Sequence, residues 1–344
     1  MLIDTMRLRI LAFSLVLITA TGIQTLAQEA LLFSRFDQTL YAFNPALSGM
    51  NTEWQVQAGF RQPFTGFDGG PNTVFAGGSG AITRYRELFR SEQTMRTSTS
   101  SEEVARLREG GKNELKHGLG FFISRYESGP FSTNRISGNY SIHIPVTSKF
   151  KASAGIGLEL VNPRLDPGEL RPRDGVNDFV YFSLISRGTS RNFLNVDLGL
   201  SVYSDRFYLG YAMHSITEAA LDPDNSTTTQ VNYTFHSLVA GGTIEFPLSV
   251  WKINPAVLVR YDEMNELQAS AMALAIWRDQ VSGGLIYKYG RSAGVTFGFK
   301  YRAQYGINYT YEFITDDAVS QLGDSSHEVV LSFRINPPST SGPR

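Results

Sequence analysis

The chain has 344 residues, of which 12% are aromatic, 32 are glycine and none is cysteine. This length allows one large domain or two small ones, and the absence of cysteine excludes disulfide scaffolds, thiol enzymes and thiolate metal sites. A net charge of −1 with 18% charged residues does not point to nucleic acid as a partner. A mean hydropathy of −0.15 is too polar for a helical membrane protein, whereas many aromatics and glycines suit strands with one apolar face.

The N-terminus has the pattern of an export signal. Arg7 and Arg9 precede an apolar run from Ile10 to Ile23, and Thr25 and Ala27 then place small residues at positions −3 and −1. We predict that residues 1–27 are a signal peptide cleaved near Ala27. The alternative, an uncleaved membrane anchor, is less well supported because the run is shorter than the ~20 residues of a membrane helix. An exported chain is either soluble or crosses a membrane as a closed barrel.

Alternation of apolar and polar residues runs along the rest of the chain. Tyr305, Ile307, Tyr309, Tyr311 and Phe313 share one face of a strand, and the residues between them are small or polar. Strands are predicted over 54–60, 73–82, 117–126, 133–144, 150–161, 193–203, 206–214, 235–246, 252–261, 266–276, 280–288, 293–301, 304–313 and 327–335.

The predicted strands are long enough to cross a membrane, since a tilted strand needs about 9–11 residues and strands of soluble proteins average about 5–6. We therefore predict an all-β fold, a single antiparallel transmembrane β-barrel of about 14 strands, within a range of 12–16, of the outer-membrane type. The soluble alternative is a β-sandwich or a pair of them.

The lengths of the connections suggest an orientation. If the N-terminus starts in the periplasm, residues 145–149, 204–205, 247–251, 277–279 and 302–303 are short periplasmic turns, and residues 162–192, 215–234 and 314–326 are long external loops. The stretch 83–116 is an exception, because it is long and falls on the periplasmic side. It is interpreted as a surface for a periplasmic partner, or else as a solvated loop; the candidate docking residues are Arg84, Arg86, Arg90, Glu102, Glu103 and Arg106.

Several short motifs carry a family resemblance. Phe33-Ser34-Arg35-Phe36 and Asn44-Pro45-Ala46-Leu47-Ser48-Gly49 open the chain, Arg61-Gln62-Pro63-Phe64-Thr65-Gly66 and Gly70-Pro71-Asn72-Thr73 follow, and Tyr140-Ser141-Ile142-His143 comes later. With these motifs the sequence resembles the PorP/SprF family of the Bacteroidetes type IX secretion and gliding machinery. The residues that match the family pattern are Phe33, Ser34, Asn44, Pro45, Gly49, Arg61, Gly66, Pro71, Thr73, Tyr140 and His143. Arg35, Leu47, Pro63 and Phe64 depart from the pattern and leave the subfamily open.

The resemblance implies an outer-membrane barrel of a Gram-negative bacterium without enzymatic activity or cofactor. Members of the family deliver or anchor secreted adhesins by their C-terminal domain, or associate with periplasmic parts of the secretion machinery. The implied partners are thus outer-membrane lipids, an adhesin C-terminal domain and periplasmic type IX components.

Within this frame, residues 28–53 are predicted to form a periplasmic segment or plug, 54–336 the barrel and 337–344 a tail. Asn44 and Pro45 break regular structure, and Gly49 can supply a turn before the first strand. Arg61 is expected to pair with a carboxylate, either in the lumen or on a partner.

Charged residues on the polar strand faces are expected to point into the lumen. Lys151, Glu159, Asp197, Lys300 and Glu312 would form a network that fills the interior or, alternatively, a conducting pathway. The five histidines form no metal or catalytic motif, so no catalytic residue and no metal site is predicted. A porin-like barrel for solutes or lipids and a barrel enzyme acting on lipids remain the alternative functions.

Overall fold

The computed structural model describes residues 33–65, 69–82, 115–170, 190–221, 234–262, 267–315, 323 and 325–335, all within one compact unit, Phe33–Arg344. The predicted signal peptide, Gly66 and the predicted docking residues of 83–114 lie outside them. The strands are β1 (Trp54–Gln62), β2 (Asn72–Ile82), β3 (Lys116–Ser128), β4 (Phe131–Pro145), β5 (Lys151–Leu165), β6 (Phe193–Tyr203), β7 (Phe207–His214), β8 (Glu218–Ala220), β9 (Phe235–Gly242), β10 (Ile244–Glu245), β11 (Trp251–Asp262), β12 (Leu267–Trp277), β13 (Val281–Lys288), β14 (Ser292–Tyr301), β15 (Tyr305–Ile314) and β16 (Ser325–Ile335).

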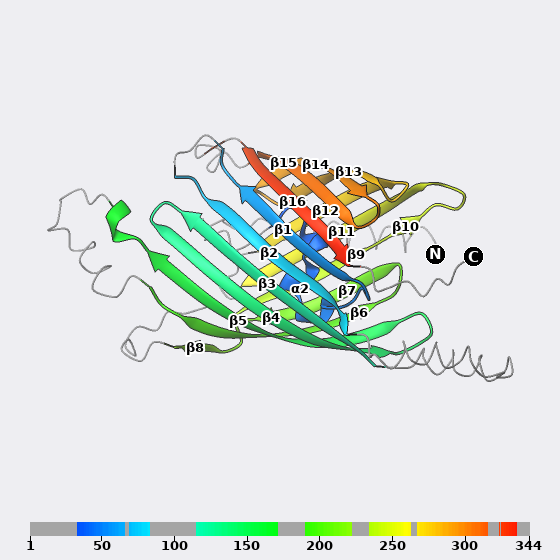
Figure 1. Ribbon diagram of the computed structural model, residues 1–344, viewed down its shortest axis with the longest axis horizontal. Helices are drawn as coiled ribbons and strands as arrows, with labels where there is room; N and C mark the ends of the chain where they lie inside the picture. The colour runs from blue at the N-terminus through cyan, green and yellow to red at the C-terminus, as the bar shows by residue number, and fades with distance from the viewer. Residues whose placement is uncertain are drawn as a thin grey trace, which may run out of the picture. The chain divides into compact units, whose positions relative to one another are not determined.

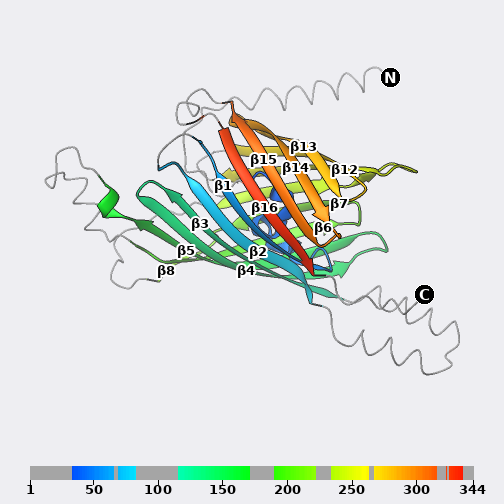
Figure 2. The same cartoon turned by 45° about the horizontal axis from the view of Figure 1, so that its top comes forward.

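The strands form a closed antiparallel barrel. Each long strand pairs with its neighbour in the chain, β11 pairs with β9, and β16 closes on β1 with a register that runs from Trp54 opposite Ile335 to Gln62 opposite His327. The ring contains 14 strands of the described chain, and the short β8 and β10 pair at its rim with β6 and β11. The predicted barrel of about 14 strands is confirmed, and both views show the seam between β16 and β1 (Figures 1 and 2).

One predicted strand is interrupted. The pattern predicts a continuous strand over 235–246, but β9 ends at Gly242 and β10 begins at Ile244. In the register of β9 and β10 on β11, Gly242 faces Pro255, because Gly241 lies opposite Ala256 and Ile244 opposite Ile253. Proline has no N–H to donate to the ladder, so the pairing lapses there. The local alternation of residues 235–246 could not predict this break, because it does not show that Pro255 lies opposite Gly242.

The two faces of the wall differ as the period-two pattern predicts. On β15, Tyr305, Ile307 and Phe313 have about half their surface exposed on the outside, while Thr310 and Glu312 are buried inside. An outward apolar band with a polar interior is the arrangement of an outer-membrane barrel. Among the described residues, no helix has the length and apolar character needed to cross a membrane.

The connections differ between the two ends of the barrel. We call the turn end the one that carries 83–115, 146–150, 204–206, 246–250, 278–280 and 302–304, and the loop end the one that carries 63–71, 129–130, 166–192, 215–234, 263–266, 289–291 and 315–324. The helical turns are η1 (Phe36–Gln38), α2 (Leu40–Phe43), η2 (Pro45–Leu47) and η3 (Pro167–Glu169); the first three precede β1, and α2 lies within the ring of strands in Figure 1.

The outward face generates a stability prediction. Leu198, near the middle of β6, is half exposed, so Leu198→Arg would place a charge in the hydrocarbon and cost about 2–4 kcal/mol of unfolding free energy. Equilibrium unfolding from lipid vesicles measures the change. Val146→Arg, in an exposed turn, is the control and should cost ~0–1 kcal/mol. Equal costs for the two variants would contradict a lipid-facing Leu198.

Candidate functional site: the plugged lumen

Residues 33–50, here called the plug, lie inside the barrel. Phe36, Asn44, Ala46 and Ser48 have no measurable exposed surface. At the start of the plug, the Phe33 ring packs on the inward rings of Phe75 and Phe122, with centroids 4.2 and 5.7 Å away. The plug therefore has the buried contacts of a core although it has little regular structure.

The sequence of the plug accounts for its local shape. Asn44 is extended, as expected before proline, and its Oδ1 accepts a hydrogen bond of 2.9 Å from the Ala46 amide, which caps η2 with Pro45 in its first turn. Gly49 then adopts a φ of +67°, which favours glycine, and directs the chain toward β1.

The inner wall binds the plug mainly through backbone carbonyl oxygens. Side chains from β1, β3, β4, β5 and β9 donate to them at 2.6–2.8 Å: Gln57 to Gln38, Asn139 to Tyr41, Ser237 to Phe43, Ser153 to Ala46, Ser141 to Ser48 and Lys116 to Met50. A buried carbonyl without a donor is costly, and each such bond is worth about 0.5–1.5 kcal/mol net. The wall thus compensates the burial of an irregular segment.

Glycines on the inward face make room for this backbone. A Cβ atom on Gly118 would overlap the Ser48 carbonyl, one on Gly155 would overlap the Ala46 amide, and one on Gly199 would overlap the Asn44 side chain. The plug therefore approaches the wall more closely than any other residue type would permit.

A cluster of buried charges holds the start of the plug near the loop end. Arg61 lies 3.3 Å from Glu312 and 3.5 Å from Glu328, and Lys288 lies 3.0 Å from Glu312. Ser34 binds both carboxylates: its amide donates to Glu328 at 2.7 Å, and its hydroxyl donates to Glu312. Buried carboxylates and cations here are paired and hydrogen-bonded, as burial of charge requires.

Two serine–histidine pairs occur in the wall, and both bind a plug carbonyl. Ser237 Oγ lies 3.0 Å from His214 Nε2, and His214 Nδ1 lies 3.2 Å from Asp197, which is the connectivity of a catalytic triad. Both Ser237 and His214, however, contact the Phe43 carbonyl oxygen, at 2.8 and 3.0 Å.

The second pair, Ser141 and His143, repeats the arrangement on the Ser48 carbonyl oxygen. His143 Nε2 donates to it at 2.8 Å, and a tyrosine, Tyr203, occupies the place of the carboxylate at Nδ1. The shared element is the bound carbonyl, so we interpret both pairs as clamps on the plug.

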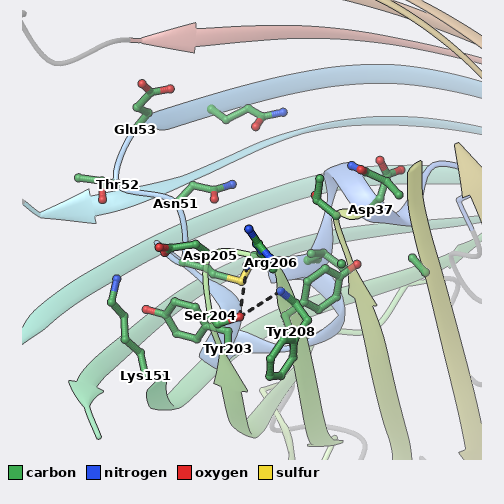
Figure 3. Close-up of a pocket in the computed structure, with 18 of the residues that line it drawn as sticks. Asp37, Asn51, Thr52, Glu53, Lys151, Tyr203, Ser204, Asp205, Arg206 and Tyr208 are labelled. Atoms are coloured by element: carbon green, nitrogen blue, oxygen red, sulfur yellow. Dashed lines mark hydrogen bonds between the residues drawn. The ribbon is translucent and has the colours of Figure 1, made fainter. Parts of the chain in front are cut away.

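A cavity of about 560 Å³ remains between the plug and the wall at the turn end. Its polar lining includes Lys116, Lys151, Tyr203, Arg206 and Tyr208, and residues 51–53 form the opposite side (Figure 3). Leu40, Met50 and Leu274 contribute apolar surface to the lining. The interior is thus closely packed around the buried plug residues 33–48 and hollow at the turn end.

Residues 25–333 match the family described as type IX secretion system membrane protein PorP/SprF. The chain belongs to the PorP/SprF family. No curated protein sequence matches it. The resemblance drawn from the sequence motifs is confirmed.

Several solved outer-membrane proteins are similar to this PorP/SprF chain at low sequence identity. The Pseudomonas putida toluene transporter TodX is 14% identical, covers 86% of this chain and 92% of its own, and has a TM-score of 0.40. The Acinetobacter baumannii protein Omp33 is 10% identical, with coverages of 84% and 100% and a TM-score of 0.45. A Pseudomonas aeruginosa FadL homologue is 12% identical, with coverages of 86% and 92% and a TM-score of 0.40.

The PorP/SprF motif residues lie mainly at the contact between plug and wall. Phe33, Ser34, Asn44, Pro45 and Gly49 belong to the plug, while Arg61, Thr73 and His143 face it from β1, β2 and β4. Two motif residues do not: Tyr140 points outward from β4, and Pro71 precedes β2 at the loop end.

The predicted lumenal charges all face inward but do not form one network. Glu312 belongs to the buried cluster, Glu159 pairs with Arg135 at 3.2 Å, and Asp197 contacts His214. Lys151 lines the cavity, and Lys300 lies on the inward face of β14. The carbonyl clamps were not predicted, although the serines on the polar faces of β4, β5 and β9 were a signal for them.

The charge cluster can be tested by Glu312→Gln. This substitution removes one of the two carboxylates that neutralise buried Arg61 and Lys288, so we expect a loss of about 3–5 kcal/mol in unfolding free energy. The control is Glu127→Gln, whose exposed pair with Arg125 should be worth ~0–1 kcal/mol. A Glu312→Gln variant as stable as the control would refute the role of the cluster.

The glycine contacts can be tested by Gly155→Val. The new side chain overlaps the plug at Pro45 and Ala46, so the unfolding free energy should fall by about 1–3 kcal/mol. Hydrogen exchange of the plug amides, followed by mass spectrometry, should accelerate. Gly138→Val is the matched control on the outward face of β4, where a Cβ meets nothing within 4 Å. Unchanged exchange in Gly155→Val would contradict close packing of the plug.

Proposed function

We propose that this PorP/SprF protein is a non-enzymatic scaffold of the type IX secretion and gliding machinery, which delivers or anchors a secreted adhesin at the cell surface or links to the periplasmic ring complex. The observation that carries the proposal is the filled lumen. The plug is bound along residues 34–50 by inward side chains, from Glu328 at its start to Lys116 at its end. A barrel with an occupied interior is best suited to act through its two ends and its lipid-facing wall.

The ends receive different partners in this proposal. The loop end faces outward, and residues 162–192, 215–234 and 314–326 hold the C-terminal domain of the adhesin. The turn end faces the periplasm, where residues 83–116, with Arg84, Arg86, Arg90, Glu102, Glu103 and Arg106, meet the secretion machinery. The support is that, apart from 83–115, the connections at the turn end are short and the longest other connections are at the loop end, since outer-membrane barrels keep periplasmic turns short.

The two serine–histidine clamps support the proposal that the protein is not an enzyme. A serine hydroxyl acts as a nucleophile only where a substrate carbonyl can reach it, and the Ser237 hydroxyl is buried against the plug. A barrel enzyme acting on lipids would moreover need its nucleophile on the outer wall or at an open mouth. Neither serine–histidine pair meets this requirement, because both lie beneath the plug.

The second candidate is a porin-like transport barrel, and the cavity at the turn end favours it, because part of the lumen is open there. Transport would require the plug to break the hydrogen bonds that side chains of the wall donate to its carbonyl oxygens. Planar-bilayer recordings separate the two: a scaffold shows no conductance, whereas a porin shows steps of current that Gly155→Val would enlarge.

The anchoring role is tested in the source bacterium. Deleting the protein should remove the adhesin from the cell surface, and replacing residues 171–189 by a short linker should do the same while the barrel still folds. Surface adhesin is measured by antibody binding to intact cells, with Glu127→Gln as the control variant. Unchanged surface adhesin in the deletion strain would overturn the anchoring role.

A further inference from the structure

The cavity at the turn end has an uneven charge. Its lining includes the cations Lys116, Lys151, Arg206 and Arg334, and the anions Asp37, Glu53 and Asp205. Two of the anions are engaged: Glu53 lies 3.3 Å from Arg334, and Asp37 lies 2.9 Å from Arg35 in the plug.

Among the described residues that line the cavity, Lys116, Lys151 and Arg206 therefore face one remaining carboxylate, that of Asp205. Among the described residues, Asp205 forms no ion pair with any of the three. Lys116 donates to the Met50 carbonyl oxygen at 2.7 Å, but an ammonium group has three donors and keeps its charge. The cavity thus carries an excess of positive charge within the barrel.

The fold brings these cations together at one level of the wall. Lys116 on β3 lies opposite His143 on β4, and Lys151 on β5 lies opposite Tyr203 on β6. The two ammonium groups lie 6.0 and 5.8 Å from the centroid of the Tyr203 ring. Arg206 follows in the exposed turn between β6 and β7, at the rim (Figure 3). Like charges so placed repel one another, and a bound anion would relieve the repulsion.

The rest of the lining shows what kind of anion fits. Leu40, Met50 and Leu274 contribute apolar surface, and Tyr208 contributes an aromatic ring. An inorganic ion would leave this surface uncovered, whereas an organic anion could place its apolar part there. The volume of about 560 Å³ is also within the range of roughly 300–1,000 Å³ that is usual for sites of small organic ligands.

We propose that this cavity is a binding site for an organic carboxylate, held by Lys116, Lys151 and Arg206 with its apolar part against Leu40 and Leu274. The carboxylate can come from an acidic residue of an amphipathic peptide that enters from the turn end, or from a free small organic acid. The site binds this chemistry whether or not the barrel anchors an adhesin.

The test is calorimetric titration of the full protein in lipid nanodiscs. The probes are a capped peptide of alternating leucine and glutamate, the same peptide with lysine for glutamate, hexanoate and inorganic phosphate. We expect the glutamate peptide, hexanoate or both to bind, with affinity that falls as salt is raised, and the lysine peptide not to bind. Binding of the peptide alone identifies a protein segment as the source, and binding of hexanoate identifies a small acid.

The variants Lys151→Gln and Arg206→Gln should each weaken binding about tenfold, as expected for the loss of one charge-assisted contact. Lys149→Gln is the matched control, since Lys149 is exposed in the neighbouring turn and does not line the cavity. Circular dichroism checks that each variant is folded, and Arg206 is on the exposed rim, where substitution leaves the barrel intact. No binding of either carboxylate probe, equal binding of the lysine peptide, binding of phosphate alone, or affinity unchanged in both variants would each overturn the proposal.

Discussion

The buried backbone of the plug is the constraint on which the composition of the inner wall depends. Residues 38–50 bring backbone carbonyl oxygens into the buried interior of the barrel, where each of these oxygens needs a donor. The wall supplies serine, asparagine, histidine and lysine side chains at those levels, and Gly118, Gly155 and Gly199 where the backbone comes closest. Small and polar inward residues are therefore explained by the plug as well as by barrel geometry.

The same segment divides the lumen into two electrostatic environments. Near the loop end, Glu312 and Glu328 neutralise Arg61 and Lys288, and the plug start is bound to the carboxylates. The hydroxyl of the plug residue Tyr41 donates a hydrogen bond to Gln57 on the wall. Near the turn end, the plug leaves a cavity where cations exceed anions. The buried charges near the loop end thus neutralise one another, whereas the excess cations near the turn end form the proposed ligand site.

Strand number, the approximate strand positions and the two faces of the wall followed from local alternation, because side chains of a strand point to opposite sides at every position. The aromatic face of β15 and the inward Glu312 were both predicted in this way. The interruption at Gly242 was not, since it depends on Pro255 in the strand opposite. Pairing partners lie far apart in the chain, and alternation carries no information about them.

The sequence by itself determined the barrel, the family and the local form of the plug, because the extended Asn44, the cap on Ala46 and the turn at Gly49 depend on neighbouring residues alone. Only the tertiary structure decided that the segment enters the lumen. It also decided that Ser141 with His143 and Ser237 with His214 hold carbonyl oxygens of the plug, and that Lys116 and Lys151 share a cavity. These contacts join residues that closure of the sheet brings together, and closure is a property of the whole ring of strands.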